Sequence, residues 1–117
     1  MNATDAGPNG VERFDDYQAA AAATAIYPPG SLTYLALGLN GEAGEVAEII
    51  KRQIRGGKPL GTEEVERLAL ELGDCLWYIA NAARELGFSL SEIAARNVTK
   101  LKDRKDRGVL HGRGDKR

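Results

Sequence analysis

Several residue types are scarce in this chain of 117 residues, and each scarcity excludes a class of protein. The single cysteine, Cys75, has no partner for an intramolecular disulfide, and its apolar neighbours indicate a small buried side chain rather than a nucleophile. The single histidine, His111, leaves too few imidazoles for a histidine zinc site or a catalytic triad. No apolar run approaches the ~20 residues of a membrane span, and the first ten residues lack the basic and apolar regions of a signal peptide. We therefore expect a cytoplasmic protein with no membrane partner.

Strand-like alternation is also absent, and the pattern predicts one all-α domain. Pro28 and Pro29 forbid helix, while the glycines that follow the second and third apolar segments end them. Candidate N-caps precede the later helices. The predicted helices run from Phe14 to Thr24, from Leu32 to Arg55, from a cap at Thr62 to Leu86, and from a cap at Ser89 to Arg107.

Charge is unevenly spread along the chain. Residues 1–95 carry 7 Lys or Arg and 14 Asp or Glu, whereas residues 96–117 carry 9 and 3. An acidic body with a basic end suits a protein that holds metal in one part and phosphate in the other. The expected organisation is a flexible N-terminal segment over 1–12, a helical domain over 13–107 and an extended basic tail over 108–117.

Two pairs of carboxylates lie among apolar residues. Glu42 and Glu45 are three residues apart on the second predicted helix, and Glu71 and Asp74 are three apart on the third. Side chains at this spacing project from one face of a helix. Glu42 falls on the apolar stripe of its helix, and the third helix is apolar nearly all round, which is typical of a buried helix. We therefore expect all four acids to face inward.

Four buried carboxylates need cations or protons. Each costs several kcal/mol to bury when ionised, and two about 5 Å apart repel by roughly 3 kcal/mol at an effective dielectric near 20. Neither helix places Lys or Arg between its paired acids, and the nearest, Lys51 and Arg52, lie at the far end. Donors that are all oxygen favour Mg²⁺, with Mn²⁺ as a possible substitute. The alternative is that these are ordinary helix acids turned to solvent.

The fourth helix carries a basic stripe, since Asn97, Lys100 and Arg104 recur at helical spacing. Such a stripe can bind phosphates through charge-assisted hydrogen bonds. It could equally be a solvated face, because both charge signs are mixed along it. Nucleic acid is the least favoured partner, since no aromatic residues are interleaved with the cations. On the third helix Trp77 and Tyr78 are consecutive and point in different directions, so we expect one of them to meet a partner subunit or a base ring.

Together these motifs resemble the MazG-like members of the all-α nucleoside triphosphate pyrophosphohydrolase superfamily. Residues 41–48 (GEAGEVAE) are similar to its first metal motif, ExxE, and residues 71–78 (ELGDCLWY) to its second, ExxD. Residues 97–104 (NVTKLKDR) are similar to its phosphate-contacting element. The resemblance extends from about Phe14 to Arg117, because the ending RGVLHGRGDKR is similar to that of one small single-domain subgroup.

The resemblance implies Mg²⁺-dependent hydrolysis of a nucleoside triphosphate to the monophosphate and pyrophosphate, in cleansing or control of the nucleotide pool. It also implies a four-helix core that needs a homodimer or homotetramer to complete it. Either Glu42 or Glu45 would take the proton of the attacking water, with Glu48 a weaker candidate. The alternatives are a non-catalytic helical oligomer that binds nucleotide or metal, and a phosphoribosyl-ATP pyrophosphatase. The implied metal ligands are Glu42, Glu45, Glu71 and Asp74, and the implied substrate contacts are Asn97, Lys100, Arg104, Lys51, Lys58, Tyr17 and Gln18. For Lys51 and Lys58 a surface role is the alternative.

Overall fold

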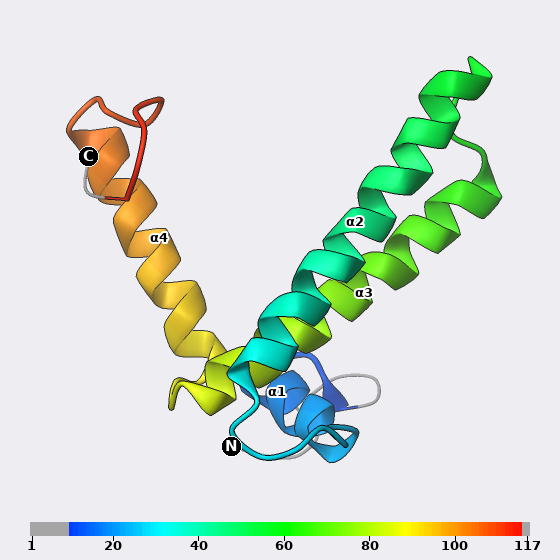
Figure 1. Ribbon diagram of the computed structural model, residues 1–117. Helices are drawn as coiled ribbons and strands as arrows, with labels where there is room; N and C mark the ends of the chain where they lie inside the picture. Colours follow the sequence, from blue (N-terminus) through cyan, green and yellow to red (C-terminus); the bar gives the residue numbers. More distant parts are fainter. Residues whose placement is uncertain (1–9, 116–117) are drawn as a thin grey trace.

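The computed structural model describes residues 10–115, and this part of the chain contains four helices and no strand (Figure 1). The predicted all-α class is confirmed. Residues 1–9 of the predicted N-terminal segment, and the last two residues of the predicted tail, lie outside the described residues. The helices are α1 (Phe14–Ala23), α2 (Leu32–Gly56), α3 (Thr62–Glu85) and α4 (Leu90–Asp106).

The helix ends follow the chemistry of their flanking residues. Gly57 ends α2 in the left-handed conformation at φ 66°, where its N–H donates to the carbonyl of Gln53 at 3.1 Å. The Ser89 hydroxyl accepts from the Glu92 N–H at 3.1 Å, which confirms the predicted cap of α4. The predicted cap at Thr62 is wrong by one residue. Gly61 is the N-cap of α3, and its N–H donates to the carboxylate of Glu64 at 3.1 Å.

The helices form a long hairpin with two further helices at its base. Figure 1 shows α2 and α3 side by side along their length, with short α1 packed at the lower end and α4 leaving in a different direction. Helix α4 packs against α1 and the end of α3. The buried cluster at this junction joins Ala21, Ala80 and Leu90, with Tyr17 and Trp77 packed against it. The small side chains of Ala21 and Ala80 let α1 approach α3 closely here.

A glutamine fixes α1 to the turn between α3 and α4. The Gln18 amide nitrogen donates to the carbonyls of Ala80, at 3.2 Å, and Phe88, at 3.0 Å. Its amide oxygen accepts from the N–H of Leu90 at 3.0 Å, at the start of α4. The Leu90 N–H lies in the first turn of α4, where a backbone N–H has no partner within its own helix, and Gln18 supplies that partner.

The single chain is more open than a compact domain of its length. Its radius of gyration is 17.1 Å, against about 13 Å expected for a compact chain. The expectation that α3 is buried all round does not hold within one chain, since Leu70 is 71% and Leu72 59% exposed. On α2, Leu37 is 69% exposed. No helix in the described part of the chain is long and apolar enough to cross a membrane.

Candidate functional site

Three of the four predicted metal ligands converge between α2 and α3. Glu42, Glu71 and Asp74 each offer one carboxylate oxygen, and these oxygens all lie within 4.8 Å of one another. Glu42 and Glu71 are partly buried and Asp74 is exposed. Glu45 contributes no oxygen to this group and is exposed, so the expectation that all four acids face inward holds only in part.

The neighbouring acids shift the pKa of one carboxyl group in the cluster. The pKa of Glu42 is raised to about 6, first by a hydrogen bond to Glu71, then by burial, and then by the charges of Asp74, Glu71 and Glu45. The Glu42 carboxyl therefore keeps its proton to a higher pH than an isolated glutamate, because its protonated form makes a hydrogen bond to Glu71. The Oε2 atom of Glu71 is buried and has no hydrogen-bond partner among the described residues. An oxygen-only cluster with an unsatisfied buried acceptor fits a divalent cation such as Mg²⁺.

A cavity of about 330 Å³ lies beside the cluster, and its lining residues are Thr24, Glu42, Asp74, Trp77 and Tyr78. The Trp77 and Tyr78 rings meet edge to face, with centroids 5.0 Å apart. The Trp77 indole N–H donates to the Thr24 hydroxyl at 2.8 Å, which fixes this wall to the end of α1. Both aromatic residues thus border one cavity, whereas the sequence predicted that they diverge. Tyr78 follows Asp74 by four residues, a spacing that could have predicted its place beside the acids.

Close packing of α2 on α3 explains one of three glycines spaced three residues apart. A Cβ atom built on Gly38 would lie 2.1 Å from Cε1 of Tyr78, so the ring occupies the space that a side chain would need. Gly41 and Gly44 meet nothing within 4 Å of such an atom. Of these three glycines, only Gly38 is therefore required by a contact with another described residue.

Residues 31–109 match the family of the MazG nucleotide pyrophosphohydrolase domain, a segment that includes both acid pairs and the basic stripe of α4. The chain belongs to the MazG family. It is 45% identical over 111 residues to the Gene 37 protein of Mycobacterium phage L5, across 88% of this chain and 97% of that protein. No solved structure matches the chain.

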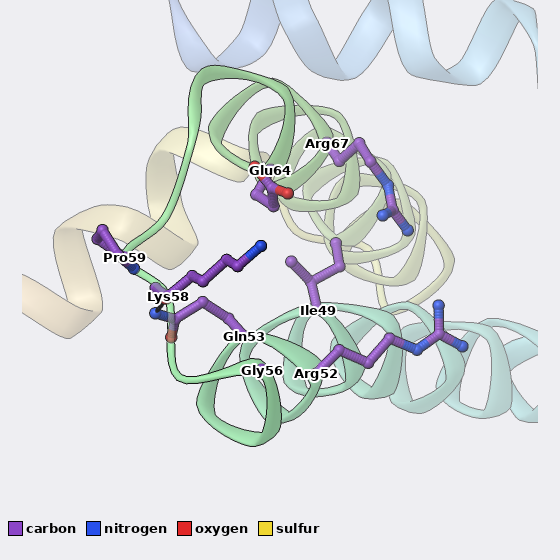
Figure 2. Close-up of a pocket in the computed structure, with 8 residues that line it drawn as sticks. All are labelled: Ile49, Arg52, Gln53, Gly56, Lys58, Pro59, Glu64 and Arg67. Atoms are coloured by element: carbon purple, nitrogen blue, oxygen red, sulfur yellow. Dashed lines mark hydrogen bonds between the residues drawn. The ribbon is translucent and has the colours of Figure 1, made fainter.

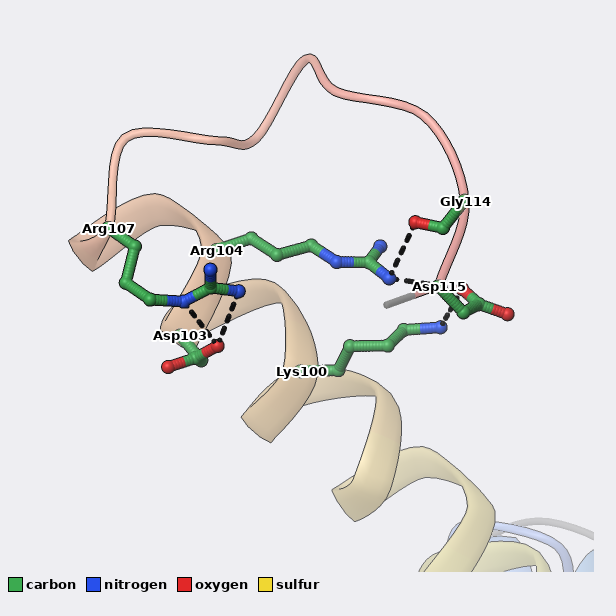
Figure 3. A network of polar contacts seen from close by, with 6 residues as sticks. All are labelled: Lys100, Asp103, Arg104, Arg107, Gly114 and Asp115. Atoms are coloured by element: carbon green, nitrogen blue, oxygen red, sulfur yellow. Dashed lines mark hydrogen bonds and ion pairs between the residues drawn. The ribbon is translucent and has the colours of Figure 1, made fainter. Parts of the chain in front are cut away.

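Within the MazG segment, the predicted phosphate contacts on α4 lie apart from the acids. Helix α4 diverges from the α2–α3 hairpin, and no residue of α4 is among those that line the cavity (Figure 1). Lys100 and Arg104 instead pair with Asp115 of the tail (Figure 3), while Asn97 is exposed on the same helix. One MazG chain therefore does not bring the basic stripe to the carboxylates.

The other predicted substrate contacts are also placed away from the cluster. The exposed Lys51 pairs with Glu48 at 2.8 Å, and the Gln18 amide is occupied by backbone groups. Tyr17 is closer, because the charge of Asp74 adds to burial in raising its pKa. Lys58 points into a cavity of about 270 Å³ at the tip of the hairpin (Figure 2). The lining of that cavity is Ile49, Arg52, Gln53, Gly56, Lys58, Pro59, Glu64 and Arg67.

Proposed function

We propose that the chain hydrolyses a nucleoside triphosphate between its α- and β-phosphates, releasing the monophosphate and pyrophosphate. The observation that carries this proposal is the meeting of three carboxylate oxygens within 4.8 Å beside an aromatic-walled cavity in a MazG chain. Glu42, Glu71 and Asp74 would hold Mg²⁺ or Mn²⁺, with Glu45 as an outer member of the set. A divalent ion there would neutralise the triphosphate and lower the pKa of the attacking water.

The residues of the chain have separate tasks in this reaction. Glu42, partly buried and hydrogen-bonded to Glu71, is one candidate to accept the proton of the attacking water. Glu45 keeps the alternative role of proton acceptor, from a more exposed position. Trp77 and Tyr78 offer ring faces and edges on which a nucleotide base could stack. The water oxygen bonds to the α-phosphorus, and the leaving pyrophosphate carries away the bridging oxygen.

We also propose that a second copy of the chain supplies the basic stripe. Lys100, Arg104 and Asn97 would bind the triphosphate from a partner's α4, since α4 of the same chain diverges from the cluster. The expanded single chain and the exposed Leu37 and Leu70 support a homodimer or homotetramer that buries them. Sedimentation equilibrium that found only monomer at micromolar concentration would contradict this.

The reaction itself is tested by product analysis. Each ribo- and deoxyribonucleoside triphosphate, and phosphoribosyl-ATP, is incubated with the protein and Mg²⁺ in water enriched in ¹⁸O. We expect pyrophosphate and a monophosphate that carries the label, because water attacks the α-phosphorus. Orthophosphate as the first product, or label in pyrophosphate, would contradict the proposal. Tight nucleotide binding without turnover would favour a binding module, and turnover of phosphoribosyl-ATP alone would assign that substrate.

The melting temperature of the protein should report metal binding independently of turnover. The raised pKa of Glu42 means that the folded, metal-free protein binds a proton more tightly than the unfolded chain. The stabilisation that this bound proton gives the folded protein is complete when the pH is below the ordinary pKa of a glutamate. It is lost as the pH rises through about 6. With EDTA, the melting temperature should therefore fall by a few degrees between about pH 5 and pH 7.5, and Mg²⁺ should restore it at the higher pH.

Glu42→Gln should abolish both responses, because the neutral amide has no proton to lose and is a poorer Mg²⁺ ligand. Glu66→Gln removes the same charge from an exposed position on α3 and should keep both. Scanning calorimetry measures the melting temperatures of the wild-type protein and of the two variants. If the melting temperature of the wild-type protein changed with neither EDTA nor pH, the acids would not form a coupled site.

A further inference from the structure

The C-terminal tail turns back onto α4. Gly108 ends the helix in the left-handed conformation at φ 72°, and the Val109 N–H donates to the carbonyl of Arg104 at 2.9 Å. A further turn follows, closed by the Gly112 N–H on the carbonyl of Val109 at 3.0 Å. The predicted extended tail is therefore wrong for residues 108–115, which return along the helix that they leave (Figure 3).

The turn brings a carboxylate between the two cations that were predicted to bind phosphate. Oδ1 of Asp115 accepts from Nζ of Lys100 and from Nη2 of Arg104, both at 3.0 Å (Figure 3). The same Arg104 nitrogen also donates to the carbonyl of Gly114 at 3.3 Å. One carboxylate oxygen thus lies where an ammonium and a guanidinium converge, which is the geometry that also suits a phosphate oxygen.

Burial shows which partner can leave. The Arg104 side chain is only 4% exposed, with Gly114 and Asp115 against its guanidinium, whereas Asp115 is 81% exposed. An ion pair whose acid is this exposed holds weakly and exchanges readily. A phosphate cannot reach the Arg104 guanidinium at this position while the tail remains in place. The Nε atom of Arg104 is also buried without a hydrogen-bond partner among the described residues, so the tail does not satisfy all of this group.

We propose that Asp115 competes within the chain for the anion site formed by Lys100 and Arg104. The tail occupies this site in the free protein and is displaced when the phosphates of a substrate bind. This inference rests on the proposed function, in which α4 receives a triphosphate. A triphosphate carries several negative charges and displaces the single exposed carboxylate of Asp115. Because the tail has to be displaced first, the measured affinity for the triphosphate is lower than it would be without Asp115.

The test compares Asp115→Asn with Asp106→Asn, which removes the same charge from the last residue of α4. Two quantities are measured: the Kd for magnesium tripolyphosphate by titration calorimetry, and the KM for the preferred nucleotide. We expect Asp115→Asn to lower both by about threefold to tenfold, because an amide accepts hydrogen bonds without the charge. Asp106→Asn should change each by less than about twofold. Asp115→Ala, which removes the acceptor as well, should lower both values at least as far.

The outcomes separate this inference from the proposed function. Unchanged or weaker tripolyphosphate binding by Asp115→Asn would overturn the competition and would make the carboxylate a support for the two cations. An equal gain in Asp106→Asn would also overturn it, because general charge would then be the cause. The calorimetric arm needs no turnover, so absence of pyrophosphate release would contradict the proposed function while leaving the tail testable.

Discussion

Asp74→Asn is expected to lower kcat/KM for pyrophosphate release by at least about a hundredfold. Asp74 supplies one of the three carboxylate oxygens that lie within 4.8 Å of one another. The amide keeps the shape of the side chain but removes the charge that binds a divalent ion. Changes to groups that only orient metal ligands already cost about 10–100-fold, and a ligand itself should cost more. Steady-state assays over a range of Mg²⁺ concentrations measure the loss.

Glu66→Gln is the matched control for this loss. Glu66 lies two turns before Asp74 on α3, is exposed and belongs to no metal-ligating group among the residues that the structure describes. It should keep wild-type turnover and the wild-type Mg²⁺ requirement. Circular dichroism establishes that both variants fold. Full activity in Asp74→Asn would mean that Asp74 does not hold the metal, even if the chain hydrolyses nucleotides.

Local signals predicted the helices to within two residues at each end. Proline, glycine and capping residues act through the backbone next to them, so their effect needs no knowledge of the rest of the fold. The Ser89 cap is an example, since its hydroxyl binds a backbone N–H only three residues away. The error at Thr62 has the same local origin, because Gly61 and Glu64 together provide a competing helix start.

The site was predictable where helix periodicity alone decides it. Spacing placed Glu71 and Asp74 on one face of α3, and both lie in the cluster. The place of Glu45 depends instead on how α2 lies against α3, which a single helix cannot reveal. The exposure of Leu70 likewise depends on surfaces outside one chain. Composition indicated an extended tail, whereas the tail turns back and places Asp115 against residues 11 and 15 positions earlier, a contact that composition cannot reveal.

Gly38→Ala should disturb the cavity through Tyr78. Alanine normally stabilises a helix relative to glycine by up to about 1 kcal/mol. Here the added Cβ would lie 2.1 Å from the Tyr78 ring, so the ring has to move. Overpacking of this kind costs about 1–3 kcal/mol. We expect a net loss of stability in urea denaturation and a fall in kcat/KM of about tenfold to a hundredfold, since a shift of about 1 Å at a site can cost that much.

Gly44→Ala is the control that separates the effect of the Tyr78 contact from the general effect of alanine on helix stability. The glycine lies six residues further along α2, where an added Cβ meets nothing within 4 Å, so alanine there should stabilise the fold and preserve turnover. A Gly38→Ala protein as stable and active as Gly44→Ala would place the Tyr78 ring elsewhere. A double-mutant cycle gives the sharper result. In a Tyr78→Ala background the ring is gone, and Gly38→Ala should then stabilise as any helical alanine does. The effect of Gly38→Ala on stability should therefore change sign between the two backgrounds. This change is expected only if the missing side chain at Gly38 makes room for the Tyr78 ring beside Glu42 and Asp74.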